Sequence, residues 1–122
     1  MPGWLRTTNC ACAGCGPSNC APPFCCTNLD TSGGDAGYYA VYNVTGQFSS
    51  TTNINVFFET YTIKDRLVIA ADGVNLYDSG CISGNVSPVV GIPGGTLNVS
   101  INVLANCEGT NGTAWVLQIS CP

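Results

Sequence analysis

The chain has 122 residues and a formal net charge of −4, and only 8% of its residues are charged, against roughly 25% in an average soluble protein. Its length predicts a single domain with a small core. Only three residues are basic, and no apolar run approaches the roughly 20 residues that span a bilayer, so neither nucleic acid nor membrane binding is expected.

The N-terminal residues 1–37 are rich in cysteine, proline and glycine and show neither strand nor helix periodicity. We therefore predict an irregular arm over residues 1–37 and a separate domain over residues 38–122. The few large apolar side chains of the arm are expected to anchor it against a neighbour or against the domain: Trp4, Leu5 and Phe24. Six of the nine cysteines also lie in the arm: Cys10, Cys12, Cys15, Cys20, Cys25 and Cys26.

These six cysteines have two interpretations. Closely spaced thiols in a small chain with proline and glycine breaks are typical of disulfides formed in an oxidising compartment. The spacing of Cys12 and Cys15 also matches half of a zinc knuckle, so a zinc or iron–sulfur site built from thiolates is the alternative. The adjacent Cys25 and Cys26 favour disulfides, but the sequence does not choose among their pairings.

From residue 38 onward the pattern indicates strands. Residues 38–44 are rich in aromatic and β-branched side chains. Within residues 53–63, one face is formed by Ile54, Val56 and Phe58, and they alternate with a second face of Asn55, Phe57, Glu59 and Tyr61.

A hairpin is predicted in the middle of the domain. Residues 66–71 and 74–77 flank Asp72-Gly73, a pair typical of a type I′ turn because both positions need a positive φ. Prolines and glycines are expected to divide the following region, residues 86–96, into an edge strand and a loop.

Two further strands are predicted near the C-terminus. Their expected buried faces are Leu97, Val99, Ile101 and Val103 in one strand and Trp115, Leu117, Ile119 and Cys121 in the other. We expect these two strands to pair with each other and to bury Trp115. No stretch has helical spacing with caps, so the predicted fold is all-β: a small antiparallel β-sandwich or jelly roll.

Three cysteines lie in this domain, at positions 81, 107 and 121. If the strands run as predicted, Cys81 and Cys107 meet at one end of the sandwich. Because nine is an odd number, at least one cysteine is free, bound to metal or joined to another chain, and Cys121 belongs to the same candidate set as the rest.

No catalytic residue is predicted. The chain has no histidine, which removes the catalytic triads and the histidine-based metal sites. Its acids could form a glycosidase pair, but several have the positions of turn residues. Glu59, Asp65 and Asp78 are instead weak candidates for a calcium site, since calcium takes carboxylate and carbonyl oxygens. No other cofactor is expected.

The run of residues 61–81, from Tyr61-Thr62-Ile63 to Ser79-Gly80-Cys81, resembles β-sandwich modules of phage virion proteins and bacterial secreted proteins. The ending, residues 112–122, is similar to the way these modules finish, so the resemblance covers roughly residues 53–122. It implies a binding or assembly role. A fainter similarity to calcium-binding CUB-type sandwiches involves the same acids, Glu59, Asp65 and Asp78.

The main functional hypothesis is a non-enzymatic structural protein of a phage-like virion, either a capsid decoration protein or a tail or fibre protein. Its partners would be copies of itself and other virion or surface proteins, with the cysteine arm as a covalent staple. The first residues lack the basic start and apolar stretch of a secretory signal. This fits a virion component that is oxidised after release from a host, or a mature secreted protein whose signal has been removed. The expected location is the virion or the extracellular space.

Two alternatives stay open. The first is a secreted module that binds carbohydrate or another surface, with a calcium ion held by acids and with an aromatic stacking platform at Tyr38, Tyr39, Tyr42 or Trp4. The second is a subunit of an extracellular filament.

Overall fold

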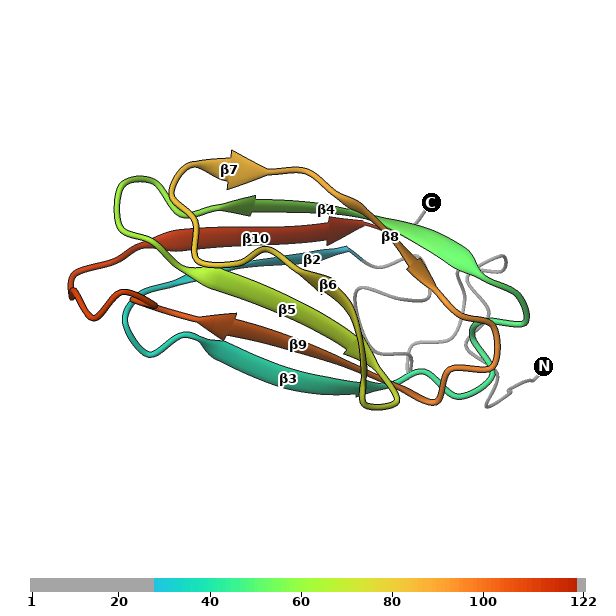
Figure 1. The fold of residues 1–122 in the computed structure, drawn as a ribbon. Helices are drawn as coiled ribbons and strands as arrows, with labels where there is room; N and C mark the ends of the chain where they lie inside the picture. Colours follow the sequence, from blue (N-terminus) through green and yellow to red (C-terminus); the bar gives the residue numbers. More distant parts are fainter. Residues whose placement is uncertain (1–27, 121–122) are drawn as a thin grey trace.

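In the computed structural model, residues 28–120 are described, and they form two antiparallel sheets that face each other as a β-sandwich (Figure 1). The predicted all-β class is confirmed. None of these residues belongs to a helix with the length and hydropathy needed to cross a membrane. The predictions for Trp4, Leu5, Phe24 and the six arm cysteines concern residues outside this range.

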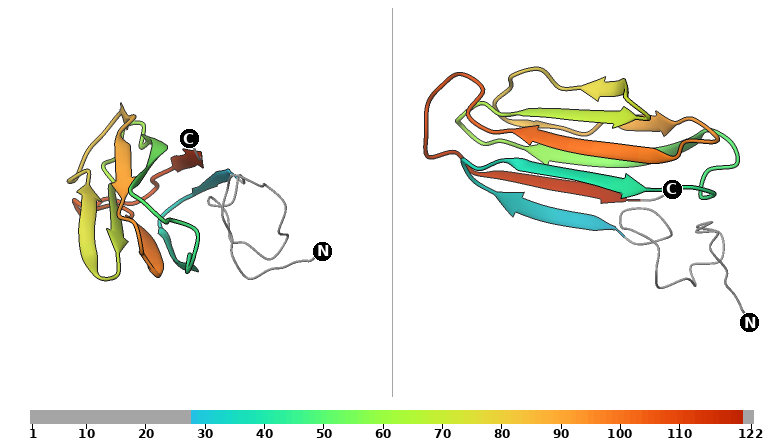
Figure 2. Two further views of the ribbon diagram at one scale, coloured as in Figure 1. Left: turned by 90° about the vertical axis from the view of Figure 1, so that its right-hand side faces the viewer. Right: turned by 90° about the horizontal axis from the view of Figure 1, so that it is seen from below.

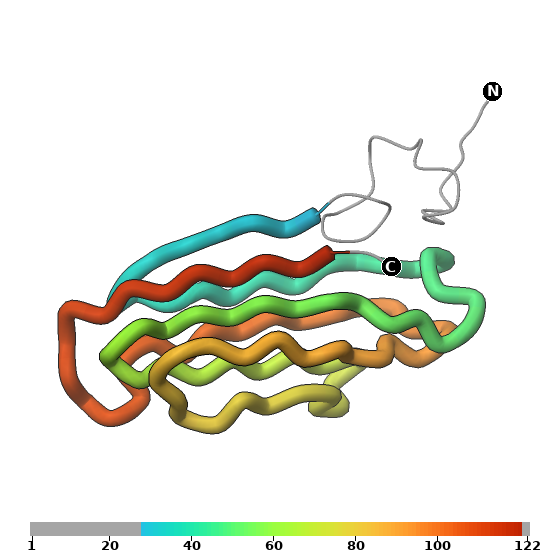
Figure 3. Tube along the Cα trace, turned by 90° about the horizontal axis from the view of Figure 1, so that it is seen from above, coloured from blue at the N-terminus to red at the C-terminus, as the bar shows by residue number. Residues whose placement is uncertain are grey.

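One sheet has five strands and the other has four. The five-stranded sheet has the order β2 (Leu29–Gly33), β10 (Trp115–Ser120), β4 (Thr52–Glu59) and β7 (Asn85–Val86), and β8 (Val89–Ile92) also pairs with β4. The four-stranded sheet has the order β3 (Tyr38–Asn43), β9 (Asn98–Leu104), β5 (Arg66–Ala71) and β6 (Val74–Asp78). The two layers are seen from the end and from below in Figure 2, and Figure 3 shows the five-stranded sheet from above.

The core lies between the sheets and follows the predicted alternation. Buried side chains come from every second position of the long strands: Ile54, Val56 and Phe58 of β4, Val99, Ile101 and Val103 of β9, and Trp115, Leu117 and Ile119 of β10. Leu97 was predicted to join them but is 51% exposed. It lies before the start of β9, where its backbone N–H donates to the Asp72 carboxylate and its carbonyl accepts from Val44 N.

The predicted hairpin is confirmed. Strands β5 and β6 pair in antiparallel fashion around Asp72 and Gly73, whose φ values are 49° and 82°. The Asp72 carboxylate also accepts a hydrogen bond of 2.9 Å from the backbone N–H of Asn98. The turn therefore ties the hairpin to the start of β9.

The predicted pairing between the last two strands is wrong. Strand β9 lies between β3 and β5 in one sheet, whereas β10 lies between β2 and β4 in the other. Both strands bury one apolar face, and in a sandwich these faces meet across the core rather than side by side in one sheet. The intervening residues 105–114 are long enough to cross the roughly 10 Å between the layers. Trp115 is buried, as predicted.

The sandwich also takes in residues that the sequence placed in the arm. Strand β2 pairs along β10 from Leu29, opposite Ile119, to Gly33, opposite Trp115. A Cβ atom at Gly33 would lie 2.6 Å from the Trp115 ring, so only glycine leaves room for the indole. The domain therefore extends N-terminally beyond residue 38, the start that the sequence predicted.

Two short strands, not one, occupy the edge region around residues 85–92. Strand β7 pairs with Phe58 and Glu59, and β8 pairs with the first half of β4. Between them, Pro88 accepts a hydrogen bond of 3.0 Å from Val56 N. The predicted break at the proline is thus present, but pairing with β4 resumes after it.

Candidate functional site

The outer face of the five-stranded sheet carries the candidate site. Because side chains alternate along a strand, the positions between the buried ones point away from the core. The strand register places Asp30, Gln118 and Phe57 side by side across β2, β10 and β4. The next outward position of β10, Ser120, lies opposite Asn55 of β4. Polar side chains therefore surround one aromatic ring on this face.

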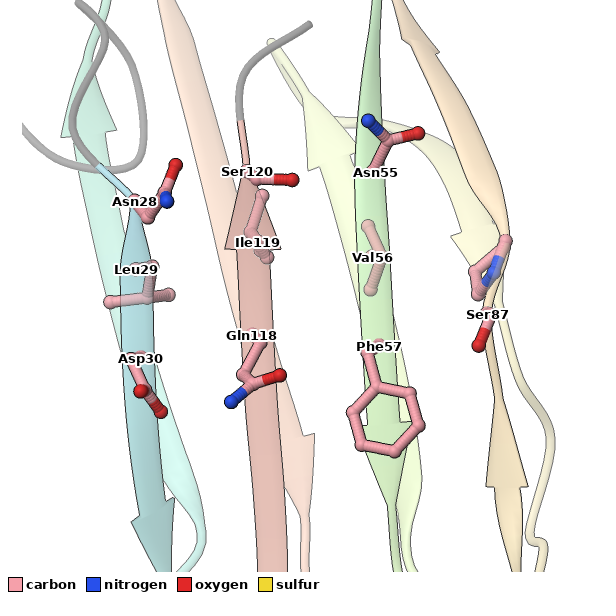
Figure 4. A pocket seen from close by; sticks show the side chains of 11 residues that line it. Asn28, Leu29, Asp30, Asn55, Val56, Phe57, Ser87, Gln118, Ile119 and Ser120 are labelled. Carbon is pink, nitrogen blue, oxygen red and sulfur yellow. The ribbon is translucent and has the colours of Figure 1, made fainter.

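These side chains line an open pocket with a volume of about 480 Å³. Its floor is the sheet, and one wall is the segment Ser87–Pro88, where the edge strands are interrupted. Figure 4 looks onto this face and shows the half-buried Phe57 ring face-on beside Gln118. The pocket therefore presents an aromatic face to solvent.

Asp30 differs from the other acids of the chain in its contacts with the described residues 28–120. Six of the seven acidic side chains accept hydrogen bonds or pair with a base: Asp35, Glu59, Asp65, Asp72, Asp78 and Glu108. Among residues 28–120, no donor contacts the carboxylate of Asp30 or the side-chain amides of Asn55 and Gln118. Within the described part of the chain, nothing occupies their hydrogen-bonding groups, which can therefore contact a ligand or water.

This arrangement has the chemistry of a binding site. Asp30 offers acceptors, and Asn55, Gln118 and Ser120 offer both donors and acceptors. The Phe57 ring supplies a flat apolar surface beside them. A ligand that fits must have an apolar face and several hydroxyl or amide groups at its rim.

The three calcium candidates make other contacts. Glu59 accepts from Tyr61 N and from the side-chain amide of Asn85. The Asp65 carboxylate is fully buried and accepts from Asn106 N at 2.9 Å and from the Thr113 hydroxyl at 2.7 Å. Asp78 pairs with the Arg66 guanidinium. Among the described residues there is no cluster of three acids, cysteines or histidines that could hold a metal, so calcium stays an unsupported prediction.

The ion pair between Arg66 and Asp78 gives a pH prediction. The guanidinium, followed by the backbone N–H of Gly80, lowers the pKa of Asp78 from 3.8 to about 2. Between these values the unfolded chain binds a proton that the folded protein does not, so stability falls as the pH is lowered from about 4 to about 2. Melting temperatures measured across this range should show the decrease. It should be smaller in Asp78→Asn, and an unchanged slope in that variant would contradict the assignment.

Cys81 and Cys107 form a disulfide, with a Cα–Cα distance of 5.9 Å. The predicted meeting of these residues is confirmed. Nearby, Cys107 N donates to Lys64 O, and Asp65 pairs with Ile82 in an isolated bridge. Cys121 lies outside the described residues, as do the arm cysteines, so their disulfide or metal role stays a prediction.

The tyrosines proposed as stacking platforms have different environments. Tyr38 and Tyr42 are half-buried, and their hydroxyl groups hydrogen-bond to each other at 2.6 Å. Burial, followed by this contact, raises the pKa of Tyr42. Tyr39 is 67% exposed on the outer face of the four-stranded sheet, beside a second hollow lined by Asn102. Trp4 lies outside the described residues.

Sequence reasoning missed the members of the pocket. The alternation within residues 53–59 did place Phe57 on the polar side of its strand, and a large aromatic ring on a polar face is the signal that could have marked it. Asp30 had no such signal, because residues 28–33 were assigned to the arm. Gln118 and Ser120 lie on a strand that was noted only for its buried side.

No protein-family model and no curated protein sequence matches the chain. Solved structures do match. The chain is similar to the tandem CBM51 modules of a family 98 glycoside hydrolase from Streptococcus pneumoniae, with 15% identity, a TM-score of 0.56, and coverage of 78% of this chain and 32% of that one. It is also similar to CBM51 of Clostridium perfringens GH95 in complex with methyl-galactose, with 15% identity, a TM-score of 0.56, and coverage of 76% and 69%.

A third match is a Clostridium perfringens protein with an M60 catalytic domain and two CBM51 domains, at 10% identity and a TM-score of 0.56. The chain covers 77% of its own length there and 11% of that protein. The chain thus spans about a third of the chain that holds the tandem CBM51 modules and about a tenth of the protein with the M60 domain. The likeness is one of fold.

Proposed function

We propose that the chain is a carbohydrate-binding module and that the outer face of its five-stranded sheet holds the sugar. The observation that carries this proposal is the open Phe57 ring flanked by Asp30, Gln118 and Asn55, whose side chains form no hydrogen bond with residues 28–120. The fold shared with CBM51 modules of secreted glycoside hydrolases supports it independently. This was the first alternative of the sequence analysis, and these observations support it better than a virion role.

The expected mode of binding follows from the two kinds of surface in the pocket. A pyranose ring has one face made of C–H groups, which packs on an aromatic ring, while its hydroxyl groups point outward from the rim. The Asp30 carboxylate accepts hydrogen bonds from hydroxyls, and the amides of Gln118 and Asn55 both donate and accept. The pocket is open, so it suits a sugar unit within or at the end of a longer chain.

Extracellular action is part of the proposal. The Cys81–Cys107 disulfide requires an oxidising environment. Carbohydrate-binding modules hold an enzyme or a cell close to its polysaccharide and carry out no bond cleavage themselves. With no histidine in the chain, and with six of its seven acids in hydrogen bonds or ion pairs, a binding role fits the chemistry of the described surface.

Phe57→Ala should abolish most of the glycan binding. Truncating a central aromatic anchor typically costs about 2 kcal/mol, which corresponds to a dissociation constant roughly thirtyfold larger. A glycan array that includes methyl-galactose would identify a ligand, and isothermal titration would then compare the wild type with the variant.

Tyr39→Ala is the matched control, because Tyr39 is an exposed aromatic residue on the opposite face of the sandwich. The control should bind like the wild type. If Tyr39→Ala lost binding while Phe57→Ala retained it, the sugar would lie on the four-stranded sheet and the proposed site would be wrong. If the wild type bound no glycan on the array, the proposed function itself would be wrong.

A further inference from the structure

Among the described residues, the charged side chains on the proposed binding face are acidic. Two acids lie on the outer face of the five-stranded sheet, Asp30 on β2 and Glu59 on β4, and Glu59 lies two positions from Phe57 along the same side of its strand. Neither of the bases among residues 28–120 is available to balance them. Lys64 pairs with Glu108 at 3.1 Å, and Arg66 pairs with Asp78 on the four-stranded sheet.

The two acids differ in what they can do to a ligand. Both carboxylate oxygens of Glu59 are engaged, one by Tyr61 N at 2.9 Å and the other by the amide of Asn85 at 3.2 Å. The carboxylate of Asp30 has no donor from the described residues and lines the pocket itself. Of the two, Asp30 therefore has the carboxylate that is open to a ligand in the pocket.

We infer that Asp30 makes the site selective for uncharged glycans and excludes glycans that carry sulfate or carboxylate groups. The inference rests on the proposed function and names the ligand class of that same site. A neutral sugar donates hydroxyl hydrogen bonds to the Asp30 carboxylate. An anionic group at the same place would be repelled by the negative charge of the Asp30 carboxylate. The described residues of this face include no base that could compensate this repulsion or replace the water that the anionic group gives up on binding.

The size of the discrimination follows from Coulomb's law. At the effective dielectric constants of a protein surface, two like charges about 6 Å apart repel enough to weaken binding roughly fivefold to a hundredfold. Anionic glycans should therefore bind at least about fivefold more weakly than their neutral counterparts. Since this repulsion acts through partly exposed charges, raising the salt concentration should reduce it.

The test compares matched glycans on one array: neutral oligosaccharides and the same structures with a sulfate, a uronic acid or a sialic acid. Dissociation constants of a neutral hit and of its sulfated counterpart are then measured at low and at high salt. We expect the neutral glycan to bind more tightly than its sulfated counterpart. The ratio of their two dissociation constants should decrease as salt is added. Equal or tighter binding of the sulfated form would overturn the inference but leave the proposed function intact, whereas an array with no hits would remove both.

The variant Asp30→Asn tests whether the discrimination against anionic glycans comes from the Asp30 carboxylate itself or from the net charge of the protein. It keeps the shape of the side chain, so it should reduce the discrimination severalfold and remove its dependence on salt, even if neutral binding also weakens. Glu108→Gln changes the net charge by the same amount far from the pocket, in a surface ion pair, and should leave the discrimination as in the wild type. If both variants changed it equally, or if Asp30→Asn left it unchanged, Asp30 would not be the selective residue.

Discussion

Replacing Trp115 with alanine should lower the free energy of unfolding by about 3 to 5 kcal/mol, a large part of the stability of a domain this small. Trp115 is 1% exposed and is the largest fully buried side chain among residues 28–120. Its indole packs on Gly33, its Nε1–H donates to the carbonyl of Gly34 at 3.0 Å, and its ring centroid lies 6.2 Å from that of Tyr38. Alanine at this position would therefore leave a cavity in the core and, beside it, a Gly34 carbonyl without its hydrogen-bond donor.

Chemical denaturation of the two proteins would measure the difference. Trp115→Phe retains most of the ring but loses the hydrogen bond to Gly34, so it should cost about 1 to 3 kcal/mol and fall between the wild type and the alanine variant. Tyr39→Ala removes an exposed ring and should stay within about 0.5 kcal/mol of the wild type. A loss of less than 1 kcal/mol in Trp115→Ala would show that the packing of β2 on β10 does not depend on the indole.

Local patterns predicted the strands better than their arrangement. Alternation in β4 and β10 identified the buried faces, and Asp72-Gly73 identified the hairpin, because both features depend on neighbouring residues alone. The sequence could not show that β9 and β10 lie in different sheets, since an apolar face has the same appearance whether its partner lies beside it or across the core. Strand β2 was missed because Leu29–Gly33 has a single strongly apolar residue and gains its stability from β10.

The site was predictable only in its chemistry. The sequence pointed to carbohydrate as an alternative ligand and to aromatic platforms, but it selected Trp4 and three tyrosines, two of which bond to each other through their hydroxyls. Asp30, Gln118 and Phe57 are far apart in the sequence and become neighbours only through the register of three strands. Such a site forms only when strands that are far apart in the sequence pair with each other, and no local sequence pattern indicates this pairing.

Loss of the Cys81–Cys107 disulfide should lower the free energy of unfolding by about 3 kcal/mol. The bond closes a loop with a sequence separation of 26 residues, and restricting a loop of this length in the unfolded chain contributes roughly that amount. The corresponding fall in melting temperature is on the order of 10 °C for a domain of this size. The double variant Cys81→Ser/Cys107→Ser isolates the effect, whereas a reducing agent would also act on the cysteines of the arm.

Hydrogen bonds also hold the loop at the same end of the sandwich, and they determine how much stability the double variant can retain. The buried Asp65 carboxylate holds Asn106 N and the Thr113 hydroxyl, and Cys107 N donates to Lys64 O. If the double variant lost less than 1 kcal/mol, these hydrogen bonds would be sufficient to order the loop without the disulfide. The pocket is built on the later half of β10, near Gln118 and Ser120, and the disulfide joins the loop before that strand. Glycan binding by the folded double variant should therefore equal that of the wild type, which would separate the role of the disulfide in stability from recognition.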